Sequence, residues 1–215
     1  MPSRVLLISA NRCVQPDPVF PLGLTHLSAA LRRAGHSTVW LDCLANVDRL
    51  DAVMDSFRPD FVGLSLRNID DVLIAKRETF FDEAVSLRAR IRRKTDCPII
   101  VGGSGFSLFP RQLLDLAGAD FGVCGEGEPG LVALIGALES GGGFAGLRRA
   151  GGAGGAGAVV ASAPQAGIPG LVFRQDGKIV VNPPAPAPLD GEHVEADRPA
   201  AITAHYLQAG GALTV

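Results

Sequence analysis

The 215-residue sequence has little of several features that mark common protein classes. No apolar run reaches about 18 residues, so we expect no membrane-spanning helix. Its 20 basic residues do not outnumber its 22 acidic ones, and a formal charge of −2 provides no basic excess to neutralise phosphates. Nucleic-acid binding is therefore not expected. The N-terminus lacks a long apolar region followed by a small-residue cleavage site, so we predict no signal peptide and a cytoplasmic location.

Cysteine and histidine are also scarce, with four residues of each. Cys13, Cys43, Cys97 and Cys124 lie far apart, and none of them forms the short-spaced pair that zinc or an iron–sulfur cluster requires. We expect them to be small buried side chains and predict no metal site. The sequence also has no P-loop and no recognisable nucleophile–base pair, so it predicts no catalytic residues of its own.

Glycine, in contrast, is abundant, and many of the 27 glycines fall within residues 141–167. This segment reads GGGFAGLRRAGGAGGAGAVVASAPQAG and has no sustained apolar period. It can bury little apolar surface, so we expect residues 141–168 to form a mobile loop that is dispensable for folding. Elsewhere the chain can bury a core, because hydrophobic residues make up 47% of the whole sequence.

Residues 1–140 alternate between strand-like and helix-like segments. Short apolar runs predict strands at residues 4–9, 38–42, 61–66, 98–101 and 120–124. Helical spacing and turn residues predict helices at residues 22–34, 47–57, 79–94, 111–116 and 129–138. This alternation predicts an α/β, doubly wound, flavodoxin-like five-stranded parallel sheet in the order 2-1-3-4-5.

The remaining residues, 169–215, are expected to form a hairpin followed by a linker. Residues 170–181 read as two strands that turn at Asp176-Gly177. Four prolines within residues 182–188 predict an extended segment, and the last 25 residues show no convincing element.

In an open parallel sheet, ligands bind beyond the carboxyl ends of the strands, near the topological switch. The residues that follow the strands are therefore the candidate ligand-binding residues. They are Ser9, Ala10, Asn11, Arg12 and Cys13 after the first strand; Ser65, Leu66, Arg67 and Asn68 after the third; Gly102, Gly103, Ser104, Gly105 and Phe106 after the fourth; and Gly125, Glu126, Gly127 and Glu128 after the fifth.

Each of these groups also has a purely structural interpretation. The glycines after the fourth strand permit close approach of a ligand, but they also suit a simple turn. Glu126 and Glu128 could accept hydrogen bonds from a ligand, or could instead favour the N-terminus of the following helix. Arg67 could face a ligand or pair with Asp70 or Asp71.

Four segments together resemble the cobalamin-binding domain that precedes the radical SAM domain in cobalamin-dependent radical SAM enzymes. They read PLGLTHLSAALRRAGH, FRPDFVGLSLRN, IIVGGSGFSLFP and GADFGVCGEGE. The resemblance covers about residues 4–140 and continues into PGLVFRQDGKIVVNPP. It implies that the strand exits hold cobalamin (B12). Gly102–Phe106 would take the nucleotide tail, and Ser65–Asn68 and Gly125–Glu128 would face the corrin ring.

The chain departs from related patterns in two ways. Methionine-synthase-like cobalamin domains carry D-x-H-x-x-G with a histidine that binds cobalt, whereas this chain has Asn-Arg-Cys-Val-Gln-Pro there. The chain also lacks C-x-x-x-C-x-x-C, so a 4Fe-4S cluster and S-adenosylmethionine would belong to a radical SAM domain, either in cis beyond Val215 or in trans. The resemblance thus implies a module that is inactive alone, from a methyltransferase-like parent.

The alternative is a flavodoxin-like interaction or signalling domain without a cofactor. A receiver domain would need clustered acids after the first strand and an aspartate ending the third, but those strands lead into Ser9-Ala10-Asn11 and Ser65-Leu66-Arg67. An FMN-binding flavodoxin would need a Ser/Thr-rich phosphate loop, which Asn11-Arg12-Cys13-Val14 does not resemble.

Two finer expectations concern the cofactor itself. A side chain at Gly103 should obstruct the nucleotide tail and weaken binding more than folding. The first exit offers Cys13 as its only soft ligand for cobalt, and a guanidinium cannot donate a lone pair. We therefore expect base-off cobalamin without a histidine ligand, with Arg67 blocking the lower face of the corrin.

Overall fold

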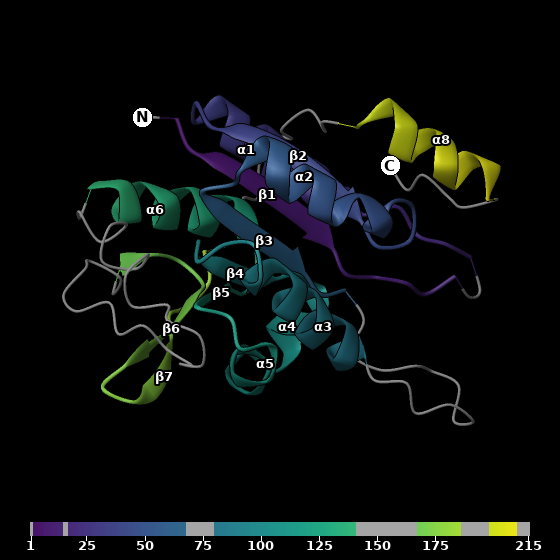
Figure 1. Cartoon of the computed structure of the whole chain (residues 1–215). Coiled ribbons are helices and arrows are strands. Elements are labelled where there is room, and N and C mark those ends of the chain that lie inside the picture. Colours follow the sequence, from purple (N-terminus) through teal and green to yellow (C-terminus); the bar gives the residue numbers. More distant parts are fainter. Residues whose placement is uncertain (1, 15–16, 68–79, 141–166, 186–197, 210–215) are drawn as a thin grey trace, which may run out of the picture.

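The computed structural model describes residues 2–14, 17–67, 80–140, 167–185 and 198–209. It shows one sheet with helices on both faces (Figure 1). The strands are β1 (Arg4–Ser9), β2 (Ser37–Asp42), β3 (Phe61–Ser65), β4 (Ile99–Gly102), β5 (Phe121–Val123), β6 (Leu171–Gln175) and β7 (Lys178–Val181). The helices are α1 (Leu22–Arg33), η1 (Val47–Arg49), α2 (Leu50–Phe57), α3 (Phe80–Arg92), α4 (Ser104–Leu108), α5 (Pro110–Ala117), α6 (Gly127–Ser140) and α8 (Ala200–Gln208).

The sheet has the order β2-β1-β3-β4-β5-β6-β7. The pairs from β2 to β5 are parallel, whereas β5–β6 and β6–β7 are antiparallel. This confirms an α/β class with a mostly parallel sheet. The parallel strands follow the order 2-1-3-4-5, and the two hairpin strands, which were expected outside the sheet, extend it to seven strands. The hairpin joins the sheet because β5 would otherwise leave a row of unpaired backbone groups at its edge.

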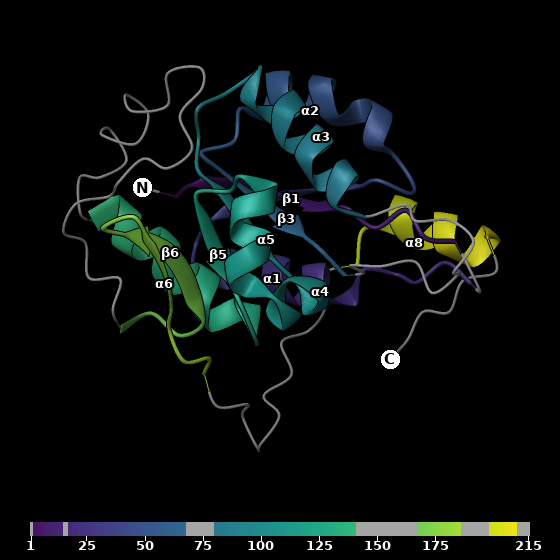
Figure 2. The same cartoon turned by 90° about the horizontal axis from the view of Figure 1, so that it is seen from below.

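Alternate residues of each strand enter opposite cores. Leu6, Ile8 and Leu64 pack with α2, α3 and α5, while Val5 and Leu7 pack with α1 and α6. Burial on both faces explains why these strands read as continuous apolar runs. Figure 2 shows α2 and α3 on the side of β1 and β3 away from α1, and α5 contributes to the same core as α2 and α3. The helices therefore change face between β1 and β3, which makes this pair the topological switch.

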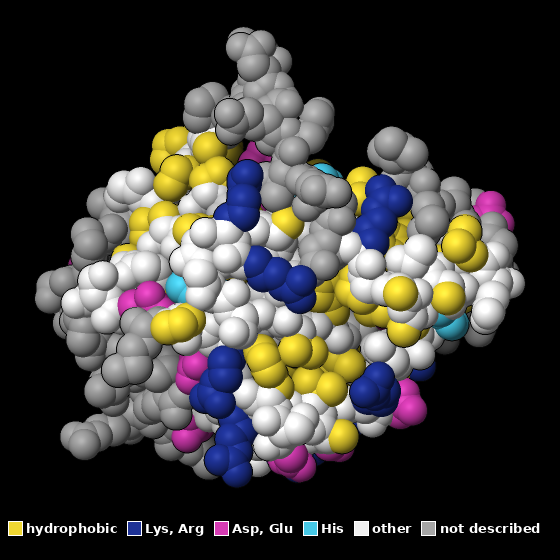
Figure 3. Space-filling view, turned by 90° about the horizontal axis from the view of Figure 1, so that it is seen from above, with side chains coloured by type: hydrophobic (Ala, Val, Ile, Leu, Met, Phe, Trp, Pro, Cys, Tyr) yellow, Lys and Arg dark blue, Asp and Glu magenta, His cyan; other side chains and the backbone are white. Residues whose placement is uncertain are grey.

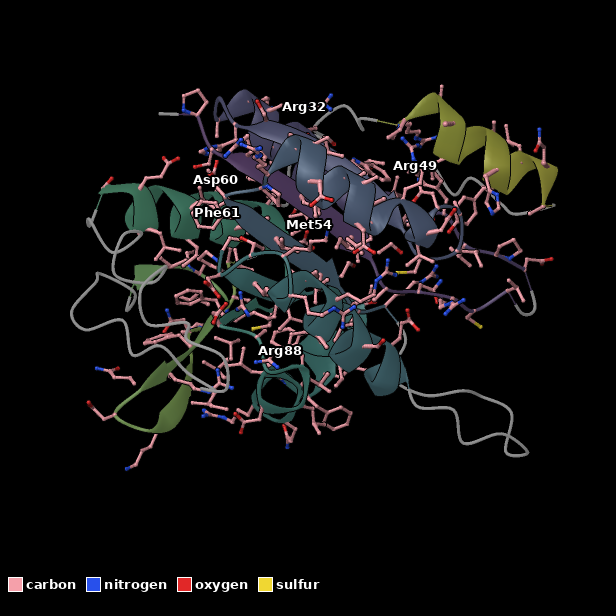
Figure 4. All side chains as sticks on the ribbon, in the orientation of Figure 1. Arg32, Arg49, Met54, Asp60, Phe61 and Arg88 are labelled. Atoms are coloured by element: carbon pink, nitrogen blue, oxygen red, sulfur yellow. The ribbon has the colours of Figure 1, made fainter. Side chains whose placement is uncertain are left out.

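One ion pair joins the amino ends of β1 and β3, at the opposite end of these strands from the candidate residues. Asp60 immediately precedes β3 (Figure 4) and accepts hydrogen bonds from both the backbone N–H and the guanidinium of Arg4, at 3.0–3.2 Å. On the outside of the fold, Arg88 donates to the Gly118 carbonyl at 2.8 Å and ties α3 to the end of α5. These contacts have a structural role.

Two helices were not expected from the sequence. α4 forms within the glycine-rich exit of β4, where we expected a loop, and α8 forms in the terminal region, where we expected no element. The expected mobile loop at residues 141–168 lies outside the described residues, except for its end at Gly167 and Ile168. Within the described part of the chain, no helix is long and apolar enough to cross a membrane.

Figure 3 shows the described Lys and Arg side chains of the upper face in separate groups, with apolar and neutral surface between them.

Candidate functional site

The carboxyl ends of the parallel strands surround a cavity of about 240 Å³, which we name the inner cavity. Strand residues Leu7, Gly63 and Ile100 line its floor, and α1 contributes Leu24 and Leu27 to its wall. The exits of β3, β4 and β5 also line it, through Ser65, Gly102, Gly103, Ser104, Gly125, Glu126, Gly127 and Glu128. Three of the four predicted exits therefore meet at one site.

A second cavity of about 300 Å³, the outer cavity, lies beside the first and shares five lining residues with it. Ser9 and Asn11 line it from the exit of β1, and Arg67 lines it from the exit of β3. The segment that leads into α1 completes the wall through Val19, Phe20, Pro21 and Leu22. The two cavities open at the β1–β3 switch, where an open α/β sheet binds its ligands.

The remaining predicted residues have other surroundings. Leu66 is buried, and Phe106 is fully buried in the core, where it packs against Gly122. Neither cavity is lined by Leu66, Phe106, Ala10, Arg12, Cys13 or Gly105. Asn68 lies outside the described residues, as do Asp70 and Asp71, the suggested partners of Arg67. Among described residues, Arg67 has no ion-pair partner.

Sequence reasoning missed the contribution of α1 and the segment before it. Gly23 lines both cavities, and a Cβ atom at this position would meet nothing within 4 Å. A glycine in the first turn of an otherwise apolar helix face was the available signal, because an empty position there leaves room beside the strand ends.

The exit of β4 is held firmly against the exit of β3. The Leu66 N–H donates to the Gly102 carbonyl at 2.8 Å, and the Leu66 carbonyl accepts from the Gly105 N–H at 2.9 Å. Gly103 has φ +100°, and a Cβ atom there would lie 2.6 Å from the Leu66 carbonyl oxygen. A side chain at Gly103 would therefore clash with the protein itself. This corrects the expectation that it would disturb a ligand more than the fold.

The exit of β1 is also ordered by its own contacts. The Cys13 N–H donates to Asn11 Oδ1 at 3.1 Å, which forms a local turn, and Arg12 pairs with Glu83 of α3 at 3.3 Å. Asn11 is buried, whereas Arg12 is exposed. Of Asn11, Arg12 and Cys13, Asn11 therefore lines the outer cavity and the other two do not.

Two buried cysteines, Cys43 and Cys124, follow strands β2 and β5. Burial raises the pKa of the Cys43 thiol to about 12 and also raises the pKa of Cys124, so neither thiol is a ready nucleophile. Among the residues that the structure describes, no group of three metal-ligating side chains exists, and no histidine lines either cavity. The arrangement suits the binding of a large organic ligand.

Comparisons with known proteins agree with this geometry. The model of the B12 binding domain family matches residues 11–135. Tryptophan 2-C-methyltransferase of Streptomyces laurentii is 33% identical over 141 residues, which are 64% of this chain and 23% of that protein. Hopanoid C-3 methylase of Methylococcus capsulatus is 32% identical over 136 residues, 57% of this chain and 25% of that protein. The chain thus spans about a quarter of these relatives.

A solved structure is similar over a larger part of the chain. The radical S-adenosylmethionine methyltransferase TsrM from Kitasatospora setae, with cobalamin and a 4Fe-4S cluster bound, has a TM-score of 0.65 and 30% sequence identity. The similarity covers 85% of this chain and 31% of TsrM.

Proposed function

The chain belongs to the B12 binding domain family and is homologous to cobalamin-dependent radical SAM methyltransferases, and we propose that it holds the corrinoid for such an enzyme. The observation that carries this proposal is the glycine-lined pair of cavities at the β1–β3 switch. The cavities combine apolar walls with a few polar groups, as large cofactor sites do. When bound, cobalamin supplies a cobalt centre that can carry a methyl group.

The residues present fit the two parts of cobalamin. The inner cavity enters the fold between α1 and the strands, and its glycines leave room for the flat base of a nucleotide tail. We assign Gly102–Ser104 and Gly125–Glu128 to the tail, because both exits line this cavity. The sequence alone had suggested that Gly125–Glu128 face the ring. Ser65 and Arg67 line the outer cavity and would face the ring and its amides.

The lower face of the corrin would have no histidine ligand. Among the described residues that line the outer cavity there is no histidine, and Cys13 does not line it either. Arg67 does line this cavity, but a guanidinium stays protonated and has no lone pair for cobalt. We therefore propose base-off cobalamin with Arg67 beneath the ring, where it would prevent axial ligation.

Activity would require a further domain. The sequence lacks C-x-x-x-C-x-x-C, so the 4Fe-4S cluster and S-adenosylmethionine would be held by a radical SAM domain in cis or in trans. In this arrangement the chain's residues bind and orient the corrinoid and do not generate the radical.

The first test is binding of hydroxocobalamin to the purified chain, followed by visible absorption after removal of free cofactor. Retained corrinoid bands are expected; a protein that binds FMN instead, or neither compound, would contradict the proposal.

The second test is EPR of the bound Co(II) form. We expect no strong nitrogen superhyperfine splitting, and strong splitting would refute the ligand-free lower face. Arg67→Ala should change the spectrum by admitting water or another ligand, with Arg12→Ala, which lies outside both cavities, as the control.

A further inference from the structure

Helix α8 lies beyond the carboxyl ends of β1 and β2, at the same end of the sheet as the two cavities (Figures 1 and 2). It follows the hairpin in sequence and lies outside residues 11–135, the part of the chain that matches the family. Its buried residues Ile202 and Tyr206 belong to the core cluster that also contains Phe20 and Trp40. The helix is therefore attached to the domain near the candidate site.

Tyr206 makes the most specific contacts of this helix. It is fully buried, and its hydroxyl donates to Asp42 Oδ2 at 2.7 Å across 164 residues of sequence. Its ring meets the ring of Phe20 edge-on, with centroids 5.5 Å apart. Phe20 lines the outer cavity, so a wall residue of that cavity is in direct contact with α8 through Tyr206.

A second connection runs through Asp42, which ends β2 and is fully buried. Its carboxylate accepts hydrogen bonds from Tyr206, from the Leu44 N–H at 3.1 Å and from the Ser9 hydroxyl. Ser9 also lines the outer cavity. Tyr206 therefore supports two wall residues of that cavity, Phe20 by ring contact and Ser9 through a shared carboxylate.

Two polar atoms near α8 are buried without a hydrogen bond. Trp40 Nε1 and Thr203 Oγ1 are both buried without a hydrogen-bond partner in the structure. Thr203 belongs to α8, and the Trp40 ring lies 6.1 Å from Phe20. Unsatisfied buried groups oppose burial. The docked position therefore depends strongly on the bond between Tyr206 and Asp42, and its loss would leave the buried Asp42 carboxyl with one hydrogen-bond donor fewer.

Resting on the function proposed above, we propose that α8 supports the wall of the cobalamin site from behind and that Tyr206 is the positioning residue that docks it. Cofactor binding and docking of α8 are then coupled. If only the docked form has a complete outer cavity, the apparent dissociation constant rises as the docked fraction falls. Conversely, bound cobalamin should hold α8 in place.

The test compares hydroxocobalamin affinity of the wild-type chain, Tyr206→Phe and Leu207→Ala. Tyr206→Phe keeps the ring on Phe20 but removes the donor to Asp42, and we expect roughly tenfold weaker binding. Leu207→Ala shortens an exposed side chain of α8 and leaves that bond intact, so its affinity should stay within about twofold of wild type. Equal affinity of Tyr206→Phe and wild type would overturn the proposal, as would equal weakening by both variants.

Two further measurements separate positioning from general stability. Hydrogen exchange of residues 200–208 should slow when hydroxocobalamin binds the wild-type chain, and exchange that is unchanged by the cofactor would overturn the proposal. Asp42→Asn removes the charge that needs the donor, so Tyr206→Phe should weaken binding less in that background; an equal effect in both backgrounds would count against the coupling. If the wild-type chain itself binds no cobalamin, the proposed function fails and this inference fails with it.

Discussion

Gly23 provides the sharpest test of where the cofactor binds. It lies in the first turn of α1, is exposed, and lines both cavities. A Cβ atom there meets no atom within 4 Å, so a larger side chain would enter the open space of the cavities without striking the protein. Gly23→Leu should therefore fill part of the proposed site while leaving the fold intact.

The expected magnitudes follow from this geometry. Replacing glycine by a good helix former stabilises a helix interior by about 1 kcal/mol and a first turn by less, so the melting temperature should stay level or rise slightly. A four-carbon side chain should exclude cofactor contacts worth at least two buried methylene groups, or about 1.6 kcal/mol. Because about 1.4 kcal/mol corresponds to a tenfold change, we expect at least tenfold weaker hydroxocobalamin binding.

The assay is a titration of the purified chain with hydroxocobalamin, together with thermal unfolding of each variant. Gly136→Leu is the matched control, because Gly136 lies in α6, also has nothing within 4 Å of its Cβ position, and lines neither cavity. It should bind like wild type. Wild-type affinity in a folded Gly23→Leu variant would refute the assignment of these cavities to cobalamin, and a large drop in its melting temperature would refute the claim of open space.

Two other substitutions test the contacts that support the cavity walls. Gly103→Ala should lower the free energy of unfolding by about 2–3 kcal/mol in urea titrations, since it combines a left-handed backbone with a close approach to the Leu66 carbonyl; a neutral result would show that the β3 and β4 exits are not held together. Burial raises the pKa of Asp42 above its ordinary 3.8. Above about pH 4 the folded chain therefore keeps a proton on Asp42 that the unfolded chain has lost. The free energy of unfolding should then fall as the pH rises toward the pKa of the folded state. Asp42→Asn should remove this part of the slope, which urea titrations across that range would reveal; an unchanged slope would contradict it.

The candidate site was partly predictable, because three of its walls are strand exits. Once the alternation of strands and helices predicts a parallel sheet, Ser65, Gly102 and Glu126 must meet at one edge. The fourth wall was not predictable in this way. Gly23 and Phe20 line the cavities from α1 and the segment before it. The apolar periodicity of a helix does not indicate how closely that helix approaches the strand ends. The burial of Phe106 was missed for a similar reason, since Gly122 makes room for its ring from another strand.

The sequence by itself determined the α/β class, the first five strands and the helices between them, because apolar periodicity depends only on neighbours in the chain. Tertiary structure alone decided three other features. The glycine-rich segment at Ser104–Leu108 became helical where its N–H groups could reach the Leu66 carbonyl, and the hairpin joined the sheet where β5 offered an open edge. Helix α8 took its position through Tyr206 and Asp42, a hydrogen bond between residues 164 positions apart. Contacts of this kind join segments that are distant in sequence, so their residues carry no local signal until the chain has folded.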